Sequence, residues 1–327
     1  MTGEPRVSIV IPVYNSRKTI EKCIESLLLL DHDSLEIIIV DDGSTDGTPE
    51  LCDRYSEVRL IRLSRGGPSR ARNIGITAAR GEFVAFTDGD CLVDARWLKE
   101  LEVPFADPRI AGTGGDQKSP DDETETGRIV QEFLKSIGFI TGYIKTDAQL
   151  RETEHNPSCN SMYRKQVLLD VGGFDESLWP GEDVELDLKI VRKGHKLMYN
   201  PSAVVFHYRP STYRGFCRMM LRYGASQWPL VMKYGLFRKL HYIPPLLIVC
   251  FLGFLAALCR EAAAAFLVIV FPALFFAWFL WKTESVSKSL TFTGLILGTI
   301  LCWNWGFFSG WINKKAAQPE QRAGVTE

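Results

Sequence analysis

Two carboxylates separated by one glycine, Asp88 and Asp90, end an apolar run in the stretch FTDGD. Carboxylate oxygens are ligands that Mg²⁺ and Mn²⁺ prefer, and the glycine lets the backbone bend so that both side chains can face one ion. An ion held there can bind a diphosphate and stabilise it as it departs. The spacing indicates metal-dependent chemistry on a nucleotide-sugar, although Asp-Gly is also a common turn pair.

Polar residues follow two other apolar runs. Tyr14 and Asn15 come after the first run, and Asp41 and Asp42 end the second, within VDDGSTDGT. If these runs are parallel strands, their carboxyl ends meet at the edge where open α/β sheets bind ligands. Each pair alone is as consistent with a solvated turn, but their convergence favours a ligand site. The sequence contains no GxGxxG after the first run and no GxxxxGK[ST], which disfavours a dinucleotide site or a P-loop.

The elements that must position these residues alternate along the first 90 positions. Four short apolar runs, at residues 7–14, 35–42, 58–63 and 82–88, predict strands. Ile20, Ile24, Leu27 and Leu28 form the apolar stripe of a helix, and Thr48 before Pro49 predicts the N-cap of another. This order predicts an α/β fold with a parallel, Rossmann-like open sheet.

Composition bounds the function and the compartment. The chain has 327 residues and a net charge of -1, which argues against nucleic acid as a partner. Its eight cysteines form no CxxC pair and no Cys/His zinc spacing, as expected of isolated thiols in a reducing compartment. The opening residues have no apolar run typical of a signal peptide, so we expect the first part to be cytosolic.

Three long apolar runs, at residues 243–259, 262–281 and 290–311, are each about long enough to cross a bilayer. A buried hydrophobic hairpin is the alternative. We therefore expect a multi-pass protein of the cell membrane with a cytoplasmic catalytic domain. Lys314 and Lys315 favour an inside location for the tail, whereas three crossings place it outside. The predicted divisions are a catalytic domain at 1–210, an amphipathic interfacial segment at 211–241, about three transmembrane helices within 242–312 and a polar tail at 313–327.

Five blocks in order resemble the inverting family 2 glycosyltransferases of the GT-A fold: VSIVIPVYN, VDDGSTDGT, GGPSRARNIGITAARGEFVAFTDGD, NSMYRKQVLLDVGGFDE and GEDVELDLKIVRKG. Together they cover most of residues 7–195. The resemblance implies that Pro12, Tyr14, Asn15 and Asp42 surround the nucleotide base and ribose, with Asp41 nearby. It also implies that Asp88 and Asp90 engage the metal ion, Mg²⁺ or Mn²⁺, and the diphosphate.

The resemblance also assigns residues of the later blocks. Asp183 matches the general base that deprotonates the acceptor hydroxyl, with Glu182 as its neighbour on the acceptor side. Both stand at a predicted helix start, where a carboxylate also complements the helix dipole. Asn160 is expected on the acceptor side or behind it. His207 follows a predicted strand and is either a third metal ligand or a simple strand end.

Two departures from the family pattern matter. Arg65 stands before the double glycine where the family often has Asn. Arg72 either adds charge on the phosphate side or solvates a helix face. The QxxRW motif of processive synthases is absent, since Gln227 and Trp228 lack its Arg, which favours addition of single sugars.

The predicted function is transfer of a sugar from a nucleotide-sugar, by default a UDP-sugar, to a lipid-linked glycan acceptor in polysaccharide, glycolipid or glycoprotein-glycan biosynthesis. A membrane anchor suits a lipid-borne acceptor because confinement raises its effective concentration. A sugar nucleotidyltransferase is one alternative, but it needs an early glycine-rich loop that IPVYNSRKT lacks. A non-catalytic scaffold is another, although it would be expected to have lost one of the carboxylates at 88, 90 or 183.

Overall fold

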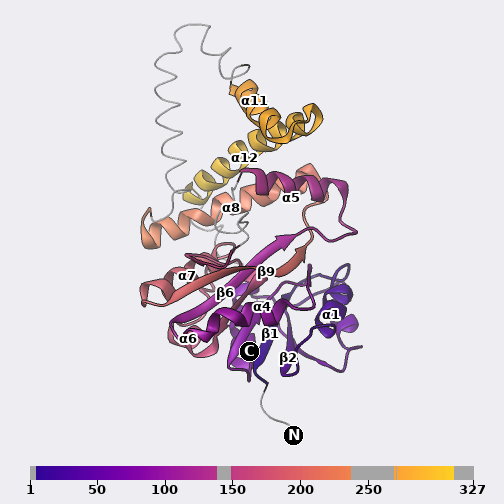
Figure 1. The fold of residues 1–327 in the computed structure, drawn as a ribbon, viewed down its shortest axis with the longest axis vertical. Coiled ribbons are helices and arrows are strands. Elements are labelled where there is room, and N and C mark those ends of the chain that lie inside the picture. The colour runs from indigo at the N-terminus through magenta and orange to yellow at the C-terminus, as the bar shows by residue number, and fades with distance from the viewer. Residues whose placement is uncertain (1–4, 138–148, 237–268, 270, 313–327) are drawn as a thin grey trace, which may run out of the picture. The chain divides into compact units, whose positions relative to one another are not determined.

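A computed structural model describes residues 5–137, 149–236, 269 and 271–312. The chain divides into two compact units, with the boundary between Arg209 and Pro210 (Figure 1). The first unit contains a sheet with helices on both faces, and the second is helical in its described part.

The first unit is built on a nine-stranded sheet. Its strands are β1 (Val7–Val13), β2 (Leu35–Asp41), β3 (Val58–Arg62), β4 (Phe83–Phe86), β5 (Cys91–Val93), β6 (Ile110–Lys118), β7 (Arg151–Thr153), β8 (Ser161–Arg164) and β9 (Lys196–His207). Their order is β3-β2-β1-β4-β8-β6-β9-β5, and β7 pairs with β9.

The four strands predicted from the sequence form the parallel half of this sheet. β3, β2, β1 and β4 run parallel, with Ile9 beside Ile37 on one side and Ala85 on the other. The other half is mixed, because β8 runs antiparallel to both β4 and β6. The fold is therefore an open α/β sheet as predicted, but the prediction of a parallel sheet is correct for one half only.

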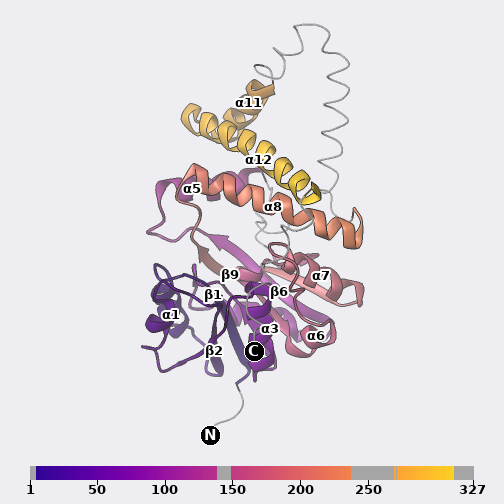
Figure 2. The same ribbon diagram turned by 180° about the vertical axis from the view of Figure 1, so that it is seen from behind.

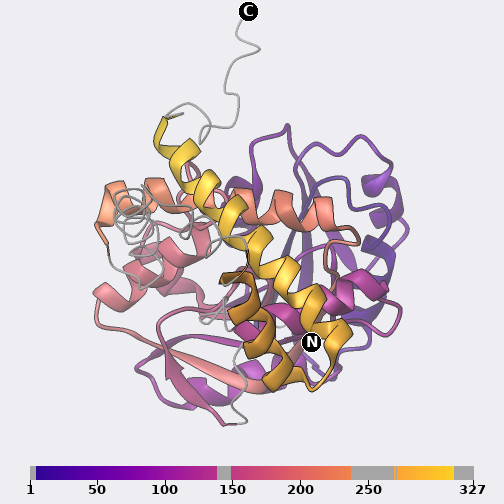
Figure 3. The same ribbon diagram turned by 90° about the horizontal axis from the view of Figure 1, so that it is seen from above.

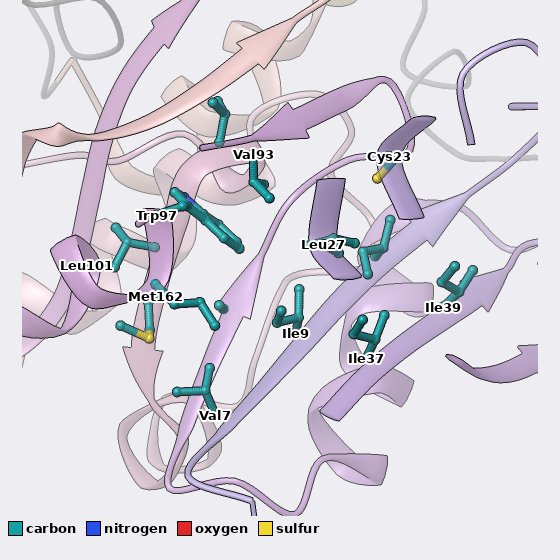
Figure 4. Packing of buried hydrophobic residues seen from close by; sticks show 14 of the residues in the cluster. Val7, Ile9, Cys23, Leu27, Ile37, Ile39, Val93, Trp97, Leu101 and Met162 are labelled. Atoms are coloured by element: carbon teal, nitrogen blue, oxygen red, sulfur yellow. The ribbon is translucent and has the colours of Figure 1, made fainter. Parts of the chain in front are cut away.

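Helices cover both faces of the sheet (Figure 2). They are α1 (Ile20–Leu28), α2 (Thr48–Cys52), α3 (Pro68–Ala78), α4 (Trp97–Glu102), α6 (Lys165–Asp170) and α7 (Glu182–Arg192), with 3-10 turns η1 (Val103–Ala106) and η2 (Ser158–Asn160) nearby. The remaining helix of this unit, α5 (Glu125–Ile137), contacts the end of β6 through a bond from Gln131 to the Gln117 carbonyl. Alternate strand residues point to opposite faces. Ile9 and Ile11 therefore enter the core under α1, α2 and α4, shown in Figure 4, while Val10 enters the core under α3, α6 and α7.

The start of α2 differs from the prediction. The residue before the helix is Gly47, with φ 86°, and Thr48 is already helical. The Thr48 hydroxyl donates to Asp46 Oδ1 at 2.5 Å and accepts from the Ser16 amide at 2.9 Å. Thr48 thus ties the loop after β1 to the loop after β2, instead of capping its own helix.

The second unit contains α8 (Tyr213–Tyr234), α11 (Phe271–Thr283) and α12 (Val286–Ile312), shown from above in Figure 3. α8 packs on α12 where glycines let the backbones approach. A Cβ on Gly224 would lie 1.9 Å from Trp303 O, and one on Gly306 would lie 2.2 Å from Leu221 O. Side chains at these two positions would separate the helices.

Within the described residues, one helical stretch, Val286–Gly310, is long and apolar enough to span a membrane. The predicted run at 243–259 lies outside the described residues, and the run at 262–281 is described only from residue 269, with α11 beginning at Phe271. The structure thus gives weak support for membrane association and none for several crossings.

Candidate active site

The loop after β2 is held by its two aspartates. Asp42 Oδ1 and Oδ2 accept hydrogen bonds from the amides of Gly66 and Gly67 at 2.7 and 2.8 Å, and Asp41 accepts from the Ser44 amide. Burial raises the pKa of Asp42, although these two amides act in the opposite direction. Both predicted nucleotide-binding carboxylates therefore also shape the loops around the site.

The loop after β1 carries two exposed residues of the predicted site, Tyr14 and Asn15. The Tyr14 side chain is 40% exposed, and the Arg65 guanidinium carbon lies 3.4 Å from the centre of its ring. Asn15, at φ 52°, accepts from the Thr45 amide at 2.8 Å through its side chain. The Arg65 that departs from the family pattern thus forms a stacked pair with Tyr14 at the sheet edge.

Arg72 links the two halves of the site. This side chain of α3 is buried, and it donates to Asp88 Oδ1 at 2.8 Å and to Glu182 Oε1 at 2.7 Å. Asp88 follows β4, whereas Glu182 is the first residue of α7. One guanidinium therefore holds together the end of a parallel strand and the start of a distant helix.

Glu182 and Asp183 begin α7 as predicted, after Gly181 at φ 108°. Burial raises the pKa of Glu182 to about 7, with Asp183 acting in the same direction and Arg72 against it. Asp183 is better connected to backbone donors: its Oδ1 accepts from the Val184 amide at 2.8 Å and its Oδ2 from the Ser158 amide at 3.3 Å. These donors fix the orientation of the carboxylate at the helix N-terminus.

A buried histidine stands behind Asp183. His155 Nε2 lies 3.9 Å from Asp183 Oδ2, and His155 Nδ1 lies 2.8 Å from Asp187 Oδ2. Asp187 also accepts from the Asn156 amide at 2.7 Å and from the Tyr163 hydroxyl at 2.8 Å. Because Asp187 acts as an acceptor in these contacts, we assign the Nδ1 proton to His155, which turns its Nε2 lone pair toward Asp183.

Asp90 and His207 lie close together. His207 ends β9, and its Nε2 is 3.6 Å from Asp90 Oδ1. Gln117 Oε1 receives a hydrogen bond from Arg209 at 2.7 Å, so this atom is an acceptor, and His207 Nδ1 at 3.2 Å must donate to it. Nε2 therefore faces Asp90, and it becomes a ligand for a cation once its proton leaves, since the other ring nitrogen already donates to an acceptor as in metal-binding histidines.

The charge around His207 is negative enough to attract a cation. Burial and Arg209 favour the neutral ring, but Asp90 and Cys159 raise the pKa of His207 to about 10. The hydrogen bond from Cys91 and the proximity of His207 lower the pKa of Cys159 to about 6, against the effect of burial. Asp90 and His207 thus lie close enough to share a divalent metal ion, while Asp88 Oδ1 is bonded to Arg72.

Two predicted residues face the protein interior. Asn160 is fully buried, accepts from Trp97 Nε1 at 2.8 Å and donates to the carbonyls of Asp116 and Ala203. These bonds hold η2 in place and engage both polar groups of the Asn160 side chain. Pro12 is a buried residue of β1 in register with Val40, one position before the strand end.

Sequence reasoning missed His155, Asp187 and the paired thiols. His155 and the thiols lie outside the five sequence blocks, and Asp187 lies in the last block without a role implied by the resemblance. Their partners are remote in the chain: His155 and Asp187 are 32 positions apart. The sequence offered one signal for Asp187: it is a charged residue between two leucines, Leu186 and Leu188, in a predicted helix.

The profile of the family described as "Glycosyl transferase family 2" matches residues 8–172. The chain belongs to this family. The profile of "Glycosyl transferase family group 2" matches residues 146–282, so the similarity continues into the second unit.

Curated relatives in the family come from bacteria and archaea. The pre-mycofactocin glycosyltransferase of Mycobacterium tuberculosis is 30% identical over 70% of this chain and 48% of its own length. The uncharacterized glycosyltransferase EpsJ of Bacillus subtilis is 40% identical over 64% of this chain and 62% of its length. The glycosyltransferase AglE of Haloferax volcanii is 30% identical over 62% of this chain and 67% of its own length. This chain thus matches about half of the first relative and under two thirds of EpsJ.

A solved structure shares the fold. The mannosyltransferase PcManGT of Pyrobaculum calidifontis, determined with GDP-Man and Mn²⁺, superposes with a TM-score of 0.65 at 21% identity and covers 93% of this chain and 88% of its own. The open mixed sheet is accordingly of the GT-A type, as the sequence predicted.

Proposed function

We propose that this family 2 member transfers a sugar from a nucleotide-sugar to a hydroxyl group, with inversion at the anomeric carbon. The observation that carries the proposal is the Arg72 bridge, because it joins Asp88 on the donor side to Glu182, the neighbour of Asp183. A donor-binding carboxylate and an oriented base at one sheet edge are what a direct displacement needs.

The protein's part in the reaction follows from that geometry. Asp183 accepts the proton of the acceptor hydroxyl, whose oxygen attacks the anomeric carbon from the face opposite the diphosphate. The carbon–oxygen bond to the diphosphate breaks, and the electron pair leaves with the nucleotide. Tyr14 and Arg65 present a flat, cationic surface at the edge where the base would lie.

A divalent ion, Mg²⁺ or Mn²⁺, would be held by Asp88, Asp90 and His207 and would neutralise the departing diphosphate when bound. The position of His207 Nε2, 3.6 Å from Asp90 Oδ1, supports this ligand set. The default donor nucleotide is UDP.

We further propose a lipid-linked glycan acceptor at a cell membrane, with the first unit in the cytoplasm. α12 supports a membrane anchor, and multiple crossings remain a prediction. α8 adds Arg214, Arg218 and Arg222, which are exposed and spaced four residues apart, so that they share one helix face. A basic face of this kind favours phosphate groups at a bilayer surface.

The test is sugar transfer by the detergent-purified full chain, with UDP-, GDP- and dTDP-sugars and lipid-phosphate-linked acceptors, with and without Mn²⁺ or Mg²⁺. We expect Asp183→Asn to lower kcat by about 100-fold or more, the usual contribution of a positioned base. It should leave donor binding unchanged. Asp90→Ala should abolish metal-dependent donor binding.

Asp33 is exposed and follows α1, away from the site, so Asp33→Asn and Asp33→Ala are the matched controls. Full turnover by Asp90→Ala would contradict the role of the carboxylates. Equal use of soluble and lipid-linked acceptors would contradict the lipid acceptor while leaving the transferase proposal intact.

A further inference from the structure

Two cysteines stand beside the carboxylate that we assign to the catalytic ion. Cys91 begins β5, Cys159 lies in η2 and His207 ends β9, yet one ligand atom from each lies within 4.8 Å of the others. In the described part of the chain, this is the one cluster of His, Cys, Asp or Glu with this spacing. Both cysteines are buried, with 0% and 5% exposure.

The backbone holds these three residues in place. Cys91 and His207 face each other directly across the antiparallel pair β5 and β9. Cys159 is positioned by its neighbour Asn160, whose side chain bonds Trp97 and two backbone carbonyls. The cluster is therefore part of the folded frame and needs no loop movement to form.

Asp90 supplies a fourth ligand atom. Its Oδ1 lies 4.0 Å from Cys91 Sγ and 3.6 Å from His207 Nε2. In a tetrahedral zinc site, with Zn–S near 2.3 Å and Zn–N or Zn–O near 2.0 Å, adjacent ligand atoms lie about 3.3 to 3.8 Å apart. The two distances from Asp90 Oδ1 thus exceed those of a tetrahedral site by only a few tenths of an ångström, and the ligand atoms of Cys91, Cys159 and His207 lie within 4.8 Å of one another.

The donor set selects a different ion from the one proposed for catalysis. Mg²⁺ and Mn²⁺ prefer oxygen ligands, whereas two thiolates with an imidazole and a carboxylate suit Zn²⁺ and similar borderline-soft ions. Binding requires the cysteines to be thiolates, so their protons pass to solvent as the ion enters. The Asp90 side chain is half exposed, which gives an ion a way in from solvent.

We propose that Cys91, Cys159, His207 and Asp90 form a site for a borderline-soft divalent cation, with Zn²⁺ as its probe, that overlaps the site for the catalytic ion. The two sites share Asp90 and His207, so they cannot be filled together. If the proposed transferase function holds, Zn²⁺ in the site inhibits transfer by removing two ligands from Mg²⁺ or Mn²⁺.

The direct test uses Co²⁺ as a spectroscopic substitute for Zn²⁺ on the reduced, metal-free full chain in detergent. We expect one equivalent to produce sulfur-to-cobalt charge-transfer absorption and the visible bands of tetrahedral Co²⁺, both lost on adding Zn²⁺. Cys159→Ser and Cys91→Ser should each weaken Zn²⁺ binding by about 100-fold or more, since even residues that only orient a ligand contribute 10- to 100-fold. Cys52→Ser, which changes a buried cysteine of α2 outside the cluster, is the matched control.

Circular dichroism and thermal unfolding establish that each variant is folded. His207→Gln gives a second measurement that leaves both thiols in place: we expect the charge-transfer bands to shift and Zn²⁺ affinity to fall. Co²⁺ bound without thiolate bands, or with identical bands in Cys91→Ser and Cys159→Ser, would overturn the site.

The activity measurement separates this inference from the proposed function. Transfer in Mn²⁺ should be inhibited by Zn²⁺ in the parent chain and in Cys52→Ser, and Cys159→Ser should resist Zn²⁺ while still using Mn²⁺. Thiolate-bound Co²⁺ in a chain that transfers no sugar would uphold the site and refute the function. Active protein that binds no Co²⁺ through sulfur would refute the site alone.

Discussion

Some residues of the proposed site affect the reaction by positioning a neighbouring side chain, and His155 is the clearest example. Its Nδ1 is held by Asp187 and its Nε2 faces Asp183, the proposed base. In this position the imidazole can orient the carboxylate and stabilise the proton that Asp183 takes from the acceptor. His155 is thus a positioning residue for the reaction.

We expect His155→Gln to lower kcat for transfer by about tenfold or more, a part of the roughly 100-fold or larger contribution of a positioned base. The KM for the donor should not change, because His155 acts on the reaction through Asp183, which lies on the acceptor side of the proposed site. Steady-state kinetics with donor and acceptor varied separately provide the measurement.

Asp187→Asn, which removes the preferred acceptor of the Nδ1 proton, should reproduce the same fall in kcat. His195→Gln changes a half-buried histidine outside the site and serves as the control. A fall in kcat matched by an equal rise in donor KM would point to a general loss of structure instead.

Functional residues could be predicted where residues close in the sequence indicate a shared role, as Asp88 and Asp90 do. Pairs formed only by folding could not be predicted. Arg72 and Glu182 are 110 positions apart, and their contact depends on how α3 and α7 pack on one sheet face. The sequence leaves open whether Asn160 contacts the acceptor or lies behind it, because nothing local reveals that its three hydrogen bonds point inward.

At the scale of the elements, the end of the sheet opposite the site has its own buried carboxylate. Glu36, near the start of β2, accepts from the Ser8 hydroxyl at 2.6 Å, from the Arg80 amide at 2.7 Å and from Arg80 Nε at 3.0 Å. Burial alone would raise its pKa, but these bonds lower it below the ordinary value.

A lowered pKa means that the charged form stabilises the fold. This contribution is present above the pH at which glutamate ordinarily titrates, about 4.3, and is lost as the pH falls through the lowered value. We expect Glu36→Gln to reduce the free energy of unfolding at pH 7 by about 1 to 3 kcal/mol, the range for hydrogen bonds to charged groups.

Urea unfolding at several pH values provides the measurement, with the exposed Glu57→Gln as control. The difference between Glu36→Gln and the parent should shrink as the pH falls through the lowered pKa of Glu36, because the parent carboxylate becomes protonated there. A difference that stays constant with pH would show that shape, not charge, determines the effect.

Helices and strands could be predicted where the spacing of apolar residues fitted only one type of secondary structure. Runs of buried residues identified β1, β2 and β4, and the stripe through Ile20 and Ile24 identified α1. The antiparallel β8 was not predictable, because SMYR is too short to carry a period and its pairing depends on β4 and β6.

For the molecule as a whole, the division into two units at Arg209 predicts that donor binding can be separated from the use of a membrane-bound acceptor. We expect a fragment ending at Ser211 to fold alone, since it retains the Arg209 bonds to Gln117, Gln131 and Glu123. It should bind donor with Mn²⁺ but use a lipid-linked acceptor about 100-fold less well, because confinement to the membrane is lost.

Calorimetric donor binding and transfer to acceptor in vesicles provide the two measurements. A fragment ending at Ala203 is the negative control, because it lacks His207 and Arg209 and should lose the metal-dependent part of donor binding. A Ser211 fragment as active on vesicles as the full chain would show that the second unit does not recruit the acceptor.

The glycine contacts between α8 and α12 also limit which mutations this pair of helices can accept during evolution. Substitutions on the exposed side of α12, at Leu301 or Trp305, leave the contact with α8 intact. One residue inserted between Ser289 and Gly306 would instead turn Gly306 by about 100° relative to the preceding part of the helix. During evolution, substitutions should therefore be tolerated on the exposed side of α12, whereas insertions and deletions in this helix should be rare.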